Sequence, residues 1–373
     1  MASADVIVIG AGIVGAAIAA AAAREGLRVL VLSDGLPGDG VTAAGMGHLV
    51  VLDDDPAELA LCKLSMALWR AFEHQPRAQY HRCGTLWIAR DDAERELLRH
   101  KQARLASAGI GTQWLSGSEV ESAEPALRLG LAAGLCVGSD AAVYAPAVAA
   151  DLVAQACEQH GARLLMPCRV RALRPGGVLL DDGGTLDAGA VVVAAGPQTG
   201  QLIPQLPLIP RKGHLVITDR APQARLSHQV VEVGYGASAH GGGDSVAFNV
   251  QPRPTGQLLI GSCRQPGRAD AALDPQMLAR MCSRAMDFMP ALASARLLRA
   301  WTGVRPGTPD GRPYIGRWPA LSGTWVAAGH EGIGVTTALG TARLLVDQLL
   351  GRPTVMDAAP FDPARAVRMA AAA

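Results

Sequence analysis

The sequence predicts an α/β fold, in which a Rossmann-like domain with a parallel sheet carries an inserted, mainly antiparallel β domain. Three observations support this prediction. Residues 6–26 have the order strand, glycine-rich turn and helix, and residues 323–350 repeat this order towards the other end of the chain. Residues 208–299 contain several short strands but one helical segment, near 275–289, and this content favours an antiparallel sheet.

The first strand, turn and helix carry a nucleotide-binding pattern. Residues 6–9 (VIVI) are β-branched and typical of a buried parallel strand, and an Ala-rich stretch that suits a helix follows the turn. In the spacing G-x-G-x-x-G, Gly10 allows the tight turn, Gly12 lets the backbone approach a pyrophosphate, and Gly15 lets the helix pack on the strand. Free N–H groups at the helix start favour negative phosphates. The predicted contacts are Gly10, Gly12, Ile13, Val14 and Gly15.

Length alone would also permit residues 6–23, which carry no charge, to enter a membrane. Much of this run is Ala and Gly, which are weakly apolar, and residues 1–5 contain an Asp but no Lys or Arg, as an export signal would require. We therefore expect no transmembrane segment. The seven cysteines form no CxxC pair and are irregularly spaced, which disfavours a disulfide framework or a metal site and fits a cytoplasmic location.

The end of the second predicted strand, residues 27–32, departs from the usual nucleotide-binding pattern. An acidic residue is expected there to hold an adenosine ribose. The sequence has Ser33 in that position and Asp34 one residue later. Either Asp34 reaches the ribose through a shifted loop, or Ser33 makes a weaker bond.

Length and charge limit the domain organisation and the partners. The chain of 373 residues is long enough for two domains. A net charge of +1 and an aromatic content of 4% argue against a nucleic-acid partner. We assign residues 1–75, 145–207 and 300–373 to the nucleotide-binding domain, and residues 76–144 and 208–299 to the inserted substrate domain.

Four segments together resemble the family of FAD-dependent amino-acid and amine oxidoreductases that includes D-amino acid oxidase, glycine oxidase and sarcosine oxidase. They are VIVIGAGIVG (6–15), AVVVAAG (190–196), GVRPGTPDGRPYIG (303–316) and AAGHEGIGVTTALG (327–340). Their order and spacing cover nearly the whole chain. Within this family, TAAGMGHLV (42–50) and CGTLW (83–87) are most similar to the catalytic, FAD-bearing subunits of bacterial D-hydroxyproline dehydrogenases.

The resemblance implies that FAD binds in an extended form. The first glycine turn would take the pyrophosphate, and the loop after residue 41 would pass the flavin ring. The C-terminal turn would place N–H groups and a helix start near the pyrimidine end of the flavin, where a positive dipole end stabilises the reduced form. Beyond the first turn, the implied contacts are Ser33, Asp34, Thr42, Ala43, Ala44, Gly45, Met46, Gly47, Val170 (through its backbone, to adenine), Ala195, Gly196, Gly329, Gly332, Ile333, Gly334, Val335 and Thr336.

Arg305 matches the arginine that binds the substrate carboxylate in this family. The planar guanidinium bonds both carboxylate oxygens at once, so arginine suits this task. Pro306 and Pro309 would fix the loop that presents it. The alternative is that Arg305 braces the adjacent turn through Asp310.

Three further residues are candidates for the active site. His48 and His330 could each bond a substrate hydroxyl, accept a proton from the amine or tune the flavin, or could be structural. Glu331 could bond a flavin ring nitrogen or a loop amide. The basic stretch 211–214 could be solvated, shape the entrance or contact a partner.

The resemblance predicts oxidation of a small secondary or D-configured amino acid to an imine by hydride transfer to FAD, with D-hydroxyproline as the expected substrate. A glycine or sarcosine oxidase that uses dioxygen is an alternative. An NAD-dependent dehydrogenase, which the first motif alone would permit, is another, and a subunit whose flavin relays electrons without binding substrate is a third. The relatives work in hetero-oligomers, so we expect electron-accepting partner subunits, through which the chain could associate with the inner face of the membrane.

Overall fold

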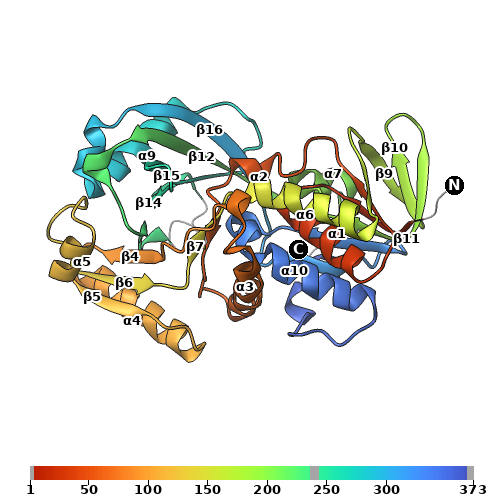
Figure 1. Cartoon of the computed structure of the whole chain (residues 1–373), viewed down its shortest axis with the longest axis horizontal. Coiled ribbons are helices and arrows are strands. Elements are labelled where there is room, and N and C mark those ends of the chain that lie inside the picture. Colours follow the sequence, from red (N-terminus) through yellow and green to blue (C-terminus); the bar gives the residue numbers. More distant parts are fainter. Residues whose placement is uncertain (1–3, 236–242, 368–373) are drawn as a thin grey trace.

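The computed structural model describes residues 4–235 and 243–367. Two eight-stranded sheets occupy opposite halves of the molecule in Figure 1, and a two-stranded sheet, β3 (His48–Leu49) with β7 (Ala141–Ala142), lies where the halves meet. One large sheet is mainly parallel and the other mainly antiparallel. The predicted fold class is therefore confirmed.

The first sheet brings the two ends of the chain together. Its strands have the order β17-β18-β11-β1-β2-β8, and β1 pairs in parallel with both β11 and β2. Strand β18, close to the C-terminus, also pairs in parallel with β11. The bounds are β1 Ala4–Ile9, β2 Val29–Leu32, β8 Arg163–Leu165, β11 Thr185–Val193, β17 Tyr314–Arg317 and β18 Thr324–Ala328; β9 Val170–Arg174 and β10 Gly177–Leu180 extend β11 as an antiparallel ribbon.

Helices from both ends of the chain cover this sheet. Helix α1 (Ile13–Arg24) packs against α6 (Ala145–His160) and α10 (Gly334–Leu349), and α10 also packs against α3 (Pro56–Trp69), as Figure 1 shows. Most of α1 is buried because its Ala side chains let neighbouring helices approach closely. The short helix α2 (Val41–Ala44) follows β2 in the chain, and the short helix α7 (Thr199–Leu202) follows β11.

The second sheet combines early and late parts of the sequence. Its order is β16-β12-β15-β14-β13-β4-β6-β5, and all neighbours are antiparallel except β4 and β13. Helix α9 (Pro275–Phe288) packs on β14 and β15, while α4 (Asp92–Ser107) and α5 (Gly117–Ala123) flank β6. The bounds are β4 Thr85–Ala89, β5 Gln113–Ser116, β6 Ala133–Val137, β12 Ile209–Arg220, β13 Gln229–Glu232, β14 Ser245–Pro252, β15 Gln257–Pro266 and β16 Leu297–Gly307.

The segment expected to form a loop around Arg305 is instead the end of β16. Arg305 pairs with Arg211 of β12, and Pro306 pairs with Pro210. Strand β16 lies at the edge of the sheet, where a proline without an N–H is tolerated. The domain boundary predicted at residue 300 falls inside the continuous strand β16. The division into domains stays a prediction. Within the described ranges, no helix is long and apolar enough to cross a membrane.

Candidate active site

The first glycine turn has the close contacts that its spacing predicts. Gly10 has a φ of +104°, and a Cβ there would lie 2.5 Å from the carbonyl oxygen of Ala194. A Cβ at Gly15 would lie 2.0 Å from the carbonyl oxygen of Gly10, so helix α1 packs on the turn as closely as backbone permits. The end of β11, where Ala195 and Gly196 follow, therefore borders this turn.

The start of α1 is open to an anion. Gly12 occupies the N-cap position and has no side chain to bond the free N–H groups. Thr42 approaches from α2, and its Oγ1 accepts a hydrogen bond of 3.0 Å from the Ile13 N–H. A Cβ at Gly12 would lie 3.2 Å from the same oxygen. The turn is a cradle of backbone groups of the kind that binds a pyrophosphate.

Ser33 and Asp34, the two residues predicted to hold the ribose, make different contacts. The Ser33 hydroxyl donates a 2.7 Å bond to the Gly35 carbonyl, whereas the Asp34 side chain is 68% exposed and lies 4.0 Å from Arg169. The N–H of Cys168 donates to the Ser33 carbonyl, so the segment that leads into Val170 lies beside the end of β2. These contacts place the predicted residues together, and their role in holding adenosine stays a prediction.

The C-terminal turn meets the loop that follows α2. Thr336 on α10 donates from Oγ1 to the carbonyl of His48 at 3.0 Å and accepts from the N–H of Val50 at 3.2 Å. Helix α10 starts at Gly334, after Ile333, whose apolar side chain cannot cap it. Two segments nearly 300 residues apart in the chain thus meet at one site.

A cavity of about 130 Å³ lies between this meeting point and the second sheet. Predicted site residues make up much of its wall: Ala44, Gly45, Met46, Gly47, His48, Arg305, Glu331, Gly332, Ile333 and Val335. Residues that the sequence analysis missed complete it, among them Trp87, Val231, Tyr235, Asn249, Ser262 and Arg264. The charged Arg264 directly after the apolar strand QLLIGSC was the available sequence signal for one of them.

Arg305 reaches the cavity from β16. Its Nη1 donates a 3.1 Å bond to the carbonyl of Cys263, and the guanidinium lies against Gly213, where a Cβ would come within 2.6 Å of Nη2. Asp310 does not hold it, because that carboxylate bonds Arg365. Arg305 is thus oriented by backbone and lines the cavity, as a carboxylate clamp requires.

Glu331, which is partly exposed, forms an ion pair with the buried side chain of Arg264 at the cavity wall. Its Oε1 lies 3.1 Å from Nε of Arg264, which also donates to the hydroxyl of Tyr235 at 3.0 Å. Burial alone would raise the pKa of Glu331, but the charges of Arg264 and Arg305 and the hydrogen bond from Arg264 lower it to about 2. Its Oε2 accepts the N–H of Gly332 at 2.6 Å, which is one of the two predicted roles, the loop amide.

His48 has both ring nitrogens engaged by protein groups. Nδ1 accepts a 2.9 Å bond from Nε2 of Gln229, and Nε2 lies 2.8 Å from Oγ1 of Thr85. Burial lowers the pKa of His48 to about 3, so the ring is neutral at physiological pH. No ring nitrogen is left for the amine proton of a substrate.

His330 does not line the cavity, although it directly precedes Glu331. Its Nε2 bonds Oγ1 of Thr341 at 3.0 Å inside the protein, and burial lowers its pKa to about 4. Glu331 adopts a φ of +46°, and with this backbone conformation the side chain of Glu331 lies at the cavity while that of His330 lies inside the protein. The contacts of His330 are structural ones. In the basic stretch, Lys212 and His214 are buried and not solvated.

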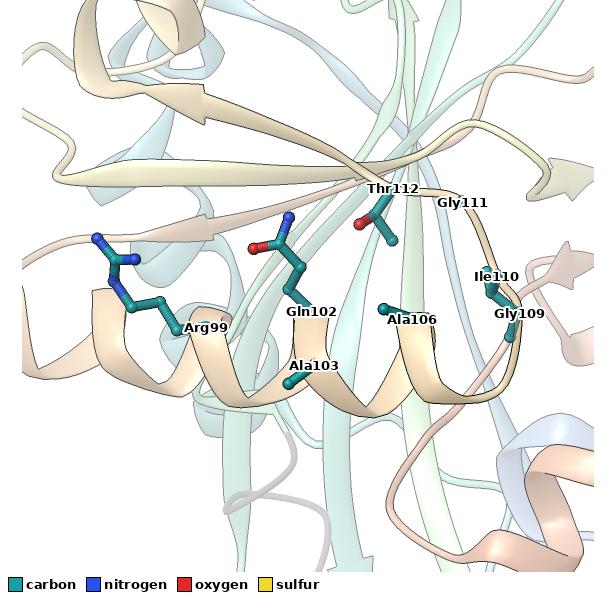
Figure 2. A pocket seen from close by; sticks show the side chains of 8 residues that line it. All are labelled: Arg99, Gln102, Ala103, Ala106, Gly109, Ile110, Gly111 and Thr112. Carbon is teal, nitrogen blue, oxygen red and sulfur yellow. The ribbon is translucent and has the colours of Figure 1, made fainter.

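A second hollow is wide and shallow. It lies along α4, where Arg99 and Gln102 project beside the segment 109–112 (Figure 2). It shares no residue with the predicted site, and its wall lacks a buried ionisable group. Among the described residues, no group of three or more His, Cys, Asp or Glu could hold a metal ion. The chemistry therefore centres on the smaller cavity.

The fold and the backbone cradle beside this cavity define an oxidoreductase that uses a dinucleotide cofactor. The family model described as FAD dependent oxidoreductase matches residues 5–348, and the chain belongs to this family. Its cofactor is FAD, so the nicotinamide alternative is wrong. Like its relatives, the protein is an FAD-dependent enzyme that acts on a CH–NH bond.

Glycine oxidases are prominent among its relatives. The chain is 30% identical over 378 residues to glycine oxidase of Geobacillus kaustophilus, covering 97% of each protein. Its fold matches the crystal structure of glycine oxidase from that organism with a TM-score of 0.86, over 97% of this chain and 98% of that one. It is 27% identical to hydrogen cyanide synthase subunit HcnC of Pseudomonas aeruginosa, over 97% of this chain and 96% of that protein. L-proline dehydrogenase from P. horikoshii shares the fold, with a TM-score of 0.88, 22% identity and 98% coverage of both chains.

Proposed function

We propose that this enzyme oxidises a small secondary or D-configured amino acid to an imine and that D-hydroxyproline is its substrate. One observation carries the choice of substrate. The two stretches that most resemble D-hydroxyproline dehydrogenase subunits, residues 42–50 and 83–87, meet at the cavity, where His48 bonds Thr85 at 2.8 Å. This contact supports the proposal, because both stretches contribute residues to the wall of the cavity.

In this proposal, Arg305 binds the substrate carboxylate and so orients the Cα–H bond. The neutral amine loses a hydride from Cα and becomes a protonated imine, which then releases its nitrogen proton to solvent. FAD supplies the hydride acceptor when it is bound. His48 has no free ring nitrogen, so the amine reacts in its neutral form. Arg264 is neutralised by Glu331, which leaves Arg305 as the cation that faces the carboxylate.

Anaerobic mixing of the yellow enzyme with single amino acids tests the substrate. We expect D-hydroxyproline to bleach the flavin absorbance faster than D-proline, L-hydroxyproline, glycine or sarcosine. Arg305→Ala should keep its flavin absorbance and lose turnover, since a lost charged bond costs about 1.5–3 kcal/mol or more. Unchanged turnover in this variant would reject direct substrate binding by Arg305, and would support a subunit whose flavin relays electrons.

Glycine or sarcosine is the second candidate substrate, favoured by the 30% identity to a glycine oxidase. This candidate would pass electrons to dioxygen, whereas our proposal passes them to partner subunits. Purification from the native cell extract, followed by assays with and without dioxygen, separates the two. Co-purifying subunits and slow reaction with dioxygen support the dehydrogenase, and hydrogen peroxide formed at the rate of substrate loss supports the oxidase.

A further inference from the structure

A buried chain of amide side chains runs from Arg253 towards the cavity. Nη1 of Arg253 donates to Oε1 of Gln251 at 3.1 Å, and Nε2 of Gln251 donates to Oε1 of Gln229 at 2.7 Å. Arginine is always a donor, so this first bond fixes which end of each amide accepts and which donates. Gln251 and Gln229 are fully buried, which makes the reversed orientation costly.

The chain divides at Gln229 and fixes the orientation of two cavity residues. Nε2 of Gln229 donates to Nδ1 of His48 at 2.9 Å and to Oδ1 of Asn249 at 2.8 Å. Because Oδ1 of Asn249 faces Gln229, its amide NH₂ points the other way. No atom of residues 4–235 or 243–367 accepts a hydrogen bond from this NH₂. Asn249 is 6% exposed and lines the cavity, so this NH₂ is available to a group that binds there.

The sheet places this donor away from the carboxylate clamp. Asn249 pairs with Val231, and Val231 pairs with Trp87, so these three residues form one row across β14, β13 and β4. Paired residues point to the same face of a sheet, and all three line the cavity. Arg305 lies on β16, three strands from β14 in the sheet order. The Arg305 guanidinium reaches the Cys263 carbonyl on β15, the strand beside β14, so one small molecule in the cavity can contact both Arg305 and Asn249.

We propose that the Asn249 amide donates a hydrogen bond to a hydroxyl group on the substrate and thereby selects hydroxylated amino acids. This inference rests on the proposed amino-acid oxidation and extends it to the substrate class. Gln229 is a positioning residue, since it holds Asn249 without lining the cavity. A substrate without the hydroxyl leaves the amide donor unpaired in a closed site, which lowers its kcat/KM.

The test compares pairs of substrates that differ by one hydroxyl group: cis-4-hydroxy-D-proline with D-proline, and D-serine with D-alanine. One neutral hydrogen bond predicts that the wild-type enzyme prefers the hydroxylated member by about tenfold in kcat/KM. Asn249→Leu should abolish this preference, so that both members of each pair react with about the same kcat/KM. Gln229→Leu should lower the same ratio. Gln113→Leu, an exposed amide on β5, is the matched control and should leave the ratio unchanged.

The outcomes separate this inference from the proposed function. If neither proline derivative is oxidised but the D-serine preference disappears in Asn249→Leu, D-hydroxyproline is the wrong substrate and the role of Asn249 stands. If Asn249→Leu lowers kcat/KM by the same factor for both members of a pair, Asn249 binds a group common to all substrates and the inference fails. Should the variants not fold, inhibition of the wild-type enzyme decides: cis-3-hydroxycyclopentanecarboxylate should bind about tenfold more tightly than cyclopentanecarboxylate, and equal binding overturns the inference.

Discussion

The ion pair of Glu331 with Arg264 allows a quantitative prediction for Glu331→Gln. A carboxyl pKa lowered from 4.5 to about 2 corresponds to about 3 kcal/mol in favour of the charged form in the folded protein. Because the folded pKa is depressed, this stabilisation is complete above about pH 4.5 and is lost as the pH falls towards 2. Glutamine keeps the shape and the backbone conformation, but it leaves the guanidinium of Arg264 buried without its counter-charge.

We therefore expect Glu331→Gln to lower the free energy of unfolding at pH 7 by about 3 kcal/mol. At about 2.1 cal/mol/K per residue, a chain of 373 residues has an unfolding entropy of about 0.8 kcal/mol/K, so Tm falls by about 4 °C. Thermal unfolding followed by circular dichroism measures this change. Arg264→Met and the double variant complete a double-mutant cycle, in which the double variant should recover part of the loss. A Tm of Glu331→Gln within 1 °C of wild type would refute the reasoning. Strictly additive effects of Glu331→Gln and Arg264→Met on the free energy of unfolding would also refute it.

Three further predictions follow from the close packing and the pKa values. Gly15→Ala places a Cβ 2.0 Å from the Gly10 carbonyl and should reduce the bound flavin per protein, measured by absorbance, whereas Gly111→Ala has nothing within 4 Å and should not. Burial raises the pKa of Asp140 to about 7, so the stability that its protonated form provides is lost as the pH rises through 7. Between about pH 5 and 8, Tm should therefore fall less in Asp140→Asn than in wild type. Parallel curves of Tm against pH for the two proteins would contradict this. His48 has a pKa of about 3 and stays neutral over the same pH range, so His48→Asn should leave the shape of the curve of kcat/KM against pH unchanged. If the variant instead loses a rise or fall of kcat/KM near pH 6.5 that wild type shows, the ring acts as a base.

The parts of the site that depend on local spacing were predictable from the sequence. Gly10 and Gly15 are required by contacts within one strand, turn and helix, so their spacing alone indicates the cradle. Asn249 and Tyr235 were not predictable, because strands distant in the sequence bring them to the cavity. Which of His330 and Glu331 faces the cavity depends on a single positive φ, and no periodicity signals it.

The parallel pairing of β18 with β11, beside β1, also has a consequence for synthesis of the protein. The first sheet lacks this strand until residue 328 has left the ribosome, although its central strand is among the first residues made. During that time the Ala-rich surface of α1 lacks the cover of α10. Contacts between such distant segments slow folding and leave apolar surface exposed to aggregation. A chain that stops before β18 should therefore accumulate as insoluble protein, and co-expressed chaperones should improve the yield of the complete chain.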